Sequence, residues 1–178
     1  MSSHVHTRDC GCLALLGRRG LFGLGLGAAA VAAARPALAL DTGYEAMLLK
    51  CIDPRFTTNT WAYMASRGWQ NLYSQFNIAG GPIGVVAPAF KDWHKTFWDN
   101  LGISVQLHNV KRMVGLTHRD CGAAAVAYGD RMKTDRAFET RMNVEALHQF
   151  RAETVKRHPN LVVELGIMEL SGAVEVVT

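Results

Sequence analysis

The sequence predicts an α/β fold in which a mainly parallel central sheet is flanked by helices and has an antiparallel C-terminal edge. Apolar runs alternate with helical patterns through most of the chain after residue 39, which favours parallel strands with helices on both faces. The first of these runs is almost wholly apolar, as expected for a strand that is covered on both faces. Two short apolar runs close the chain around Ser171-Gly172 and predict the antiparallel edge.

The first predicted unit is a strand at residues 44–51 followed by a helix at residues 57–67. Pro54 ends the strand, and polar residues at the start of the helix can cap it. Trp61 and Met64 have the spacing of residues that share one buried helix face.

The middle of the chain predicts a second strand at residues 72–78 and a long amphipathic helix at residues 88–101. The segment Ala79-Gly80-Gly81-Pro82 breaks the strand, and Gly102 is expected to end the helix. One face of this helix is rich in aromatic side chains, which indicates core or a subunit interface. These residues are Phe90, Trp93, Phe97, Trp98 and Leu101.

The last third of the chain follows the same alternation. The predicted strands here are residues 110–117, 161–168 and 173–177, and the predicted helices are residues 123–128 and 142–157. The polar stretch 129–135 is expected on the surface.

Candidate ligands follow two of the predicted strands. Cys51 and His118 stand where strands end, and Cys121 precedes a predicted helix. Sites in parallel sheets form at the carboxyl ends of strands, so these residues are expected to converge. Two thiolates and one imidazole suit Zn²⁺, and three protein ligands leave a position open for water. Because Asp53 and Arg55 stand beside the first ligand, we interpret the pattern as a zinc hydrolase or hydratase site.

Three simpler interpretations compete with this one. Cys51 and Cys121 could form a disulfide, which is the usual meaning of two cysteines in an exported chain. Asp53 could close a structural zinc site as a fourth ligand, or could form an ordinary ion pair with Arg55. Asp120 is expected to cap a helix.

Residues 1–39 have the layout of an export signal of the twin-arginine type. Arg18-Arg19 precede an apolar stretch of 14 residues, and Ala37-Leu38-Ala39 is a small-x-small cleavage pattern. The apolar stretch is shorter than the roughly 20 residues of a membrane-spanning helix. We therefore expect a single zinc-binding domain at residues 40–178, without a stable membrane anchor once the signal is removed, located in a bacterial periplasm.

The charge of the chain lies largely in this leader. The whole sequence carries a net charge of +4, and residues 40–178 carry +1. No basic run with interleaved aromatic residues remains in the domain, so nucleic acid is not an expected partner.

The order Cys-x-Asp-x-Arg, a long gap and then His-x-x-Cys-Gly resembles the β-class carbonic anhydrases. Residues 78–81 look like the Asn-Ala-Gly loop of that family, and residues 165–174 look like its terminal strand and hairpin. The resemblance spans residues 44–177.

The resemblance implies reversible hydration of carbon dioxide to bicarbonate by a zinc-bound hydroxide. Cys51, His118 and Cys121 would bind zinc, Asp53 would orient the hydroxide, and Arg55 would hold Asp53 ionised. It also implies a homodimer or a higher homo-oligomer. His94, His108, His148 and His158 are proton-shuttle candidates by residue type alone.

Departures from the family pattern leave alternatives open. Asn77, Ile78 and Thr117 replace the family's usual Arg, Asn and Gly near the substrate pocket. Carbonyl sulfide or carbon disulfide hydrolysis on the same scaffold is therefore an alternative. A non-catalytic exported domain, stabilised by zinc or by a disulfide, is another.

Overall fold

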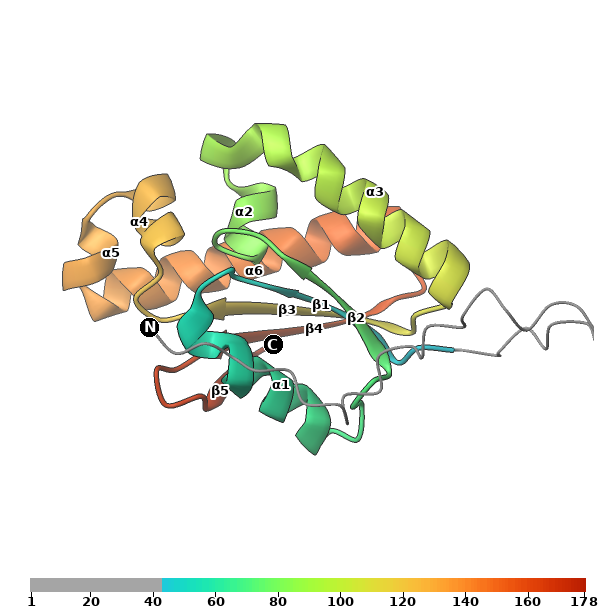
Figure 1. Ribbon diagram of the computed structural model, residues 1–178. Coiled ribbons are helices and arrows are strands. Elements are labelled where there is room, and N and C mark those ends of the chain that lie inside the picture. The colour runs from blue at the N-terminus through green and yellow to red at the C-terminus, as the bar shows by residue number, and fades with distance from the viewer. Residues whose placement is uncertain (1–42) are drawn as a thin grey trace, which may run out of the picture. The chain divides into compact units, whose positions relative to one another are not determined.

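A five-stranded sheet with helices on both faces organises residues 43–178, the part of the chain that the computed structural model describes (Figure 1). The strand order is β2-β1-β3-β4-β5, with β5 antiparallel to β4 and the other neighbours parallel. The predicted fold class is confirmed. The whole predicted export signal, residues 1–39, lies outside the described residues, which begin at residue 43.

All five predicted strands are present, with ends within two residues of the expected ones. The strands are β1 (Ala46–Lys50), β2 (Tyr73–Asn77), β3 (Arg112–His118), β4 (Val162–Met168) and β5 (Val174–Val177). Because β1 and β3 are parallel neighbours, Cys51 and His118 come together at one edge of the sheet.

Successive residues of β1 point to opposite faces of the sheet and help to build two core layers. Leu48 packs in one layer with Met64 of α1 (Thr57–Ser66). Leu49 packs in the other with residues of α3 (Lys91–His108) and α6 (Arg136–Arg157), among them Phe97 and Phe150. Figure 1 shows α1 on one side of the sheet and α2 (Pro82–Val86), α3 and α6 on the other.

Helix α3 continues past Gly102, where it was expected to end. A single interior glycine costs about 1 kcal/mol relative to alanine, and burial of Leu101 and Ser104 on either side of it outweighs that cost. Asn109 ends the helix instead, in the left-handed conformation with φ 47°. Most of the aromatic stripe is core, as expected, but Trp93 is 38% exposed and stacks on the Phe90 ring.

Short helices occupy two segments for which none was expected. All of α2 (Pro82–Val86) is buried beneath α3 and α6. Within the polar stretch 129–135, α5 (Arg131–Thr134) buries Met132. Helix α6 begins six residues before its predicted start, where the Asp135 carboxylate accepts a hydrogen bond from the Phe138 amide.

Of the two residues predicted to share the buried face of α1, the prediction is confirmed for Met64 and wrong for Trp61. Met64 is fully buried, whereas Trp61 is 50% exposed. The other buried residue of the helix is Thr60, so the inward face is set by positions 60 and 64, one position away from Trp61.

Across residues 43–178, no helix combines the length and the apolar character needed to cross a bilayer.

Candidate metal centre

Three buried side chains meet at the carboxyl edge of the sheet. One ligand atom each from Cys51, His118 and Cys121 lies within 4.8 Å of the other two. Cys51 follows β1, His118 is the last residue of β3, and Cys121 precedes α4 (Gly122–Tyr128). The structure thus brings together the three residues that the sequence pattern predicts as metal ligands.

The loop after β2 closes over Cys51. The Gly80 amide donates a hydrogen bond to Cys51 Sγ at 3.2 Å. A Cβ atom on Gly81 would lie 2.9 Å from the Leu116 carbonyl oxygen and 3.0 Å from the Cys51 nitrogen, and its φ is 56°. Glycine is therefore required at position 81 for the loop to approach the ligand.

The orientation of the His118 ring leaves one nitrogen available for a metal. Nδ1 lies 2.8 Å from the Arg119 carbonyl oxygen, which can only accept, so Nδ1 carries the hydrogen. Nε2 is then a lone-pair donor, and it is buried with no hydrogen-bond partner among the described residues. Backbone carbonyls that accept a hydrogen bond from the other ring nitrogen impose this orientation on metal-binding histidines. The Phe56 ring packs on the imidazole with centroids 4.2 Å apart.

The two thiols stand close enough to influence one another's ionisation. A hydrogen bond from Cys121 lowers the pKa of Cys51, and that same contact, with burial, raises the pKa of Cys121. The amides of Ala123 and Ala124 at the start of α4 favour the Cys121 thiolate, but weakly by comparison. Without a cation the pair shares one proton, because two buried thiolates repel each other.

This donor set fits a metal ion. Both cysteines are free thiols in the structure, and the unpartnered Nε2 of His118 would otherwise leave a buried acceptor unsatisfied. Soft sulfur with imidazole suits Zn²⁺ among the common biological metals.

Asp53 and Arg55 form a close ion pair beside this group. Arg55 Nη2 lies 2.7 Å from Asp53 Oδ2, Nε lies 3.1 Å from both carboxylate oxygens, and the Arg55 amide donates to Oδ1 at 3.0 Å. These bonds lower the pKa of Asp53 to about 2, so the carboxylate is ionised at neutral pH.

Asp120 was expected to cap a helix, but it accepts hydrogen bonds from Arg55 instead. Its carboxylate accepts a bond from Arg55 Nη1 at 2.8 Å, and its carbonyl accepts one from Nη2 at 3.1 Å. The residue has φ 57°, and Cys121, not Asp120, stands at the N-cap of α4, with no side-chain cap bond. Arg55 therefore links the segment after β1 to the segment after β3.

A buried arginine beside the ligands was not anticipated from the sequence. Arg119 is 3% exposed and contacts three carboxylates, with the shortest contact at 2.9 Å to Glu175. Its backbone amide bonds to the Met168 carbonyl of β4. The three carboxylates belong to Glu139, Glu169 and Glu175.

Glu139 also accepts a hydrogen bond from the Asp120 amide, with 2.7 Å between the amide nitrogen and Oε1 of Glu139. Both residues between His118 and Cys121 are thus fixed by long-range contacts. In the sequence, the only local indication of these contacts is that an arginine and an aspartate stand between two candidate ligands.

The four other histidines of residues 43–178 are not part of the metal-ligand group. His94 and His148 contact the backbone carbonyls of Ala87 and Thr178, and His108 and His158 are partly exposed. None of the contacts at the candidate centre selects one of them as a proton shuttle.

Comparison with known proteins gives relatives by sequence and by fold. No protein-family model matches the sequence. An uncharacterised protein of Rickettsia conorii is 29% identical over 129 residues, covering 72% of this chain and 69% of its own length. A second, from Rickettsia bellii, is 28% identical and covers 72% and 79%.

Solved structures of two β-carbonic anhydrases are similar to this chain in fold. The β-carbonic anhydrase CafA of Aspergillus fumigatus aligns with a TM-score of 0.52 at 18% identity, over 79% of this chain and 78% of that one. The wild-type β-carbonic anhydrase CafD of the same fungus aligns with a TM-score of 0.50 at 14% identity, over 76% and 90%. The chain has the β-carbonic anhydrase fold. At these identities the likeness concerns the fold alone, and the chemistry is argued from the residues of the metal centre.

Proposed function

We propose that this protein is a zinc-dependent carbonic anhydrase that hydrates carbon dioxide reversibly to bicarbonate. The observation that carries the proposal is the buried group of Cys51, His118 and Cys121 with an ionised Asp53 held beside it. The β-carbonic anhydrase fold supports it, as does the resemblance of the two sequence segments that supply these residues.

Cys51, His118 and Cys121 would hold the zinc ion. Zinc supplies a Lewis acid that lowers the pKa of water to about 7, which makes a nucleophile at neutral pH. The Asp53 carboxylate accepts a hydrogen bond from the attacking oxygen and orients its lone pair toward the carbon of the substrate. Arg55 keeps Asp53 ionised and fixes its direction through paired charge-assisted bonds.

The direct test is carbon dioxide hydration by Asp53→Ala, measured by stopped flow together with zinc content. Loss of the positioned acceptor should lower the hydration rate by about a hundredfold or more, the range for a positioned proton-transfer group. Zinc content should stay at the wild-type level, because Asp53 is not one of the three ligands. Full activity in this variant would refute the assigned mechanism.

Assays of the zinc-loaded wild-type protein with carbon dioxide, carbonyl sulfide and carbon disulfide distinguish this function from the two alternatives. Hydrolysis of carbonyl sulfide or carbon disulfide without carbon dioxide hydration would assign the site to sulfur substrates. A zinc-loaded protein that is inactive on all three would identify a non-catalytic domain.

Export and assembly are further parts of the proposal. Residues 1–39 would direct the protein to the periplasm, and the mature chain would begin at Leu40. Mass spectrometry of the exported protein tests this, since an uncleaved N-terminus would refute it.

We also propose a homodimer or a multiple of it, by resemblance to the family, and sedimentation giving a stable, active monomer would exclude that.

A further inference from the structure

We infer that a cavity between β1, β2 and α1 binds a small organic carboxylate that carries a flat apolar group. The inference does not depend on carbon dioxide hydration. It rests on a buried lysine, on the character of the cavity wall and on the size of the cavity.

Lys50 is the charged group of this cavity. It is 5% exposed, and among residues 43–178 its ammonium makes a single hydrogen bond, a long one of 3.4 Å to the Cys51 carbonyl oxygen. Among the described residues that line the cavity, Lys50 is the one charged side chain, and none is acidic. Burial lowers the pKa of Lys50, and the nearby Cys51 and Asp53 groups act in the opposite direction. No carboxylate among the described residues forms a direct ion pair with the ammonium, so an anionic ligand would offset the cost of burying it.

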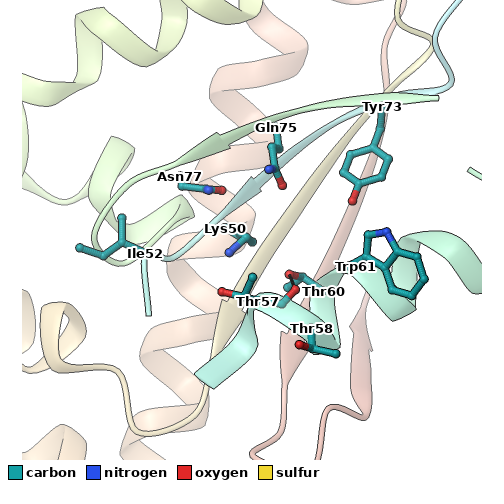
Figure 2. A pocket seen from close by; sticks show the side chains of 9 residues that line it. All are labelled: Lys50, Ile52, Thr57, Thr58, Thr60, Trp61, Tyr73, Gln75 and Asn77. Atoms are coloured by element: carbon teal, nitrogen blue, oxygen red, sulfur yellow. Dashed lines mark hydrogen bonds between the residues drawn. The ribbon is translucent and has the colours of Figure 1, made fainter. Parts of the chain in front are cut away.

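Neutral polar groups surround Lys50. Figure 2 shows Lys50 in the middle of the cavity, with Thr57 and Thr60 on the α1 side and Gln75 and Asn77 on the β2 side. The Thr60 hydroxyl already donates to the Phe56 carbonyl. In the described part of the chain, the Thr57 hydroxyl and the Gln75 and Asn77 amides have no side-chain hydrogen bond, so they remain available to a ligand.

The start of α1 adds to the positive character of this end. The helix begins at Thr57 without a side-chain cap, and Thr57 and Thr58 both line the cavity. A 3₁₀ turn at Pro54–Phe56 runs directly into this helix, and the Thr57 amide donates to the Pro54 carbonyl. The first turn therefore contributes the partial positive charge of the helix dipole, which favours an anion. A carboxylate is the oxyanion that these groups and Lys50 would recognise together.

The other end of the cavity is aromatic. Trp61 and Tyr73 lie together there, away from the Lys50 ammonium (Figure 2). The exposed half of Trp61 was predicted to be core, and the cavity gives it a role as an apolar wall. The volume of about 440 Å³ lies within the range of small-molecule sites and exceeds what bicarbonate alone would fill. A ring attached to the carboxylate accounts for both the size and the aromatic end.

The test is calorimetric titration of the full-length, zinc-loaded protein with benzoate, with benzamide as the uncharged ligand of the same shape. Benzoate should bind, and benzamide should bind at least about tenfold more weakly. Lys50→Met keeps the length of the side chain and removes the charge, and it should weaken benzoate by about tenfold or more while zinc content is unchanged.

A matched pair of tryptophan variants tests the aromatic wall. Trp61→Ala should weaken benzoate several-fold, and Trp93→Ala, at the partly exposed tryptophan of α3, should leave binding unchanged. Absence of binding at about 10 mM benzoate would overturn the inference. So would binding that survives Lys50→Met and disappears on chelation of zinc, because the ligand would then sit on the metal.

Discussion

Arg55 holds two carboxylates at once, and this makes it sensitive to a conservative change. Its guanidinium bonds to Asp53 through Nε and Nη2 and to Asp120 through Nη1. A lysine has a single charged nitrogen and cannot reproduce this planar fork. Arg55→Lys should therefore lower carbon dioxide hydration by about tenfold or more, since Asp53 loses its paired bonds. Stopped-flow assays at equal zinc content measure the change.

Asp120→Asn is the matched control for that variant. It weakens the outer bond to Arg55 and leaves the bonds to Asp53 in place, so its effect on the rate should be smaller. If the two variants were equally active, Arg55 would be a surface charge without a positioning role.

The sequence predicted which three side chains would meet at the candidate metal centre, but not the residues that support them. The convergence of Cys51, His118 and Cys121 could be predicted because their side-chain types are uncommon and each stands beside the end of a regular element. The burial of Arg119 and Lys50 could not, because charged residues are usually solvated and nothing local marks these two as exceptions. Burial of Arg119 depends on three glutamates that lie 20 to 56 residues away in the sequence.

At the scale of elements, Arg119 ties the end of β3 to α6 and to the hairpin of β4 and β5. Removing a buried cation leaves the carboxylates around it unpaired, which typically costs 3 to about 5 kcal/mol. Arg119→Met should lower the free energy of unfolding by this order, measured by urea denaturation. Arg131→Met is the control, because the exposed Arg131–Asp135 pair should contribute only about 0–1 kcal/mol. Equal effects would mean that the network adds nothing beyond a surface ion pair.

The loop after β2 gives a second prediction at this scale. Gly81 and Gly68 both have positive φ, but a Cβ at position 68 meets no atom within 4 Å, whereas at 81 it meets backbone on two strands. Gly68→Ala should cost about 1 kcal/mol of stability, the strain of a left-handed alanine. Gly81→Ala should cost more and should also weaken zinc binding, because Cys51 must move. Zinc competition with a chromogenic chelator measures the second effect, and unchanged affinity would show that the loop does not constrain the ligand.

The elements that the sequence predicted incompletely have a common physical cause. Gly102 was taken as the end of a helix, but local propensity was outweighed by the burial of its neighbours in α3. Helix α2 has five residues, all of them buried, so it is too short and too uniformly apolar to show a helical period. Both depend on packing between segments far apart in the chain, which no local pattern records.

For the whole molecule, the candidate metal centre is a consequence of sheet assembly. Its ligands come from the ends of β1 and β3, which are neighbours in space and are separated by a helix, a strand and two further helices in sequence. The unfolded chain cannot present these ligands at 4.8 Å, so zinc should bind the folded state in strong preference. Metal binding is then coupled to folding, and its free energy adds to stability.

Chelation of zinc should therefore destabilise the protein. A ligand present at a thousand times its dissociation constant adds about 4 kcal/mol to the free energy of unfolding. Scanning calorimetry with and without chelator, in reductant to keep Cys51 and Cys121 as thiols, should show a fall in Tm of several degrees. His118→Ala should show little response to the chelator, because two thiols remain where three ligands are needed. An equal Tm for the wild-type protein with and without zinc would mean that the three side chains do not hold a metal in the folded state.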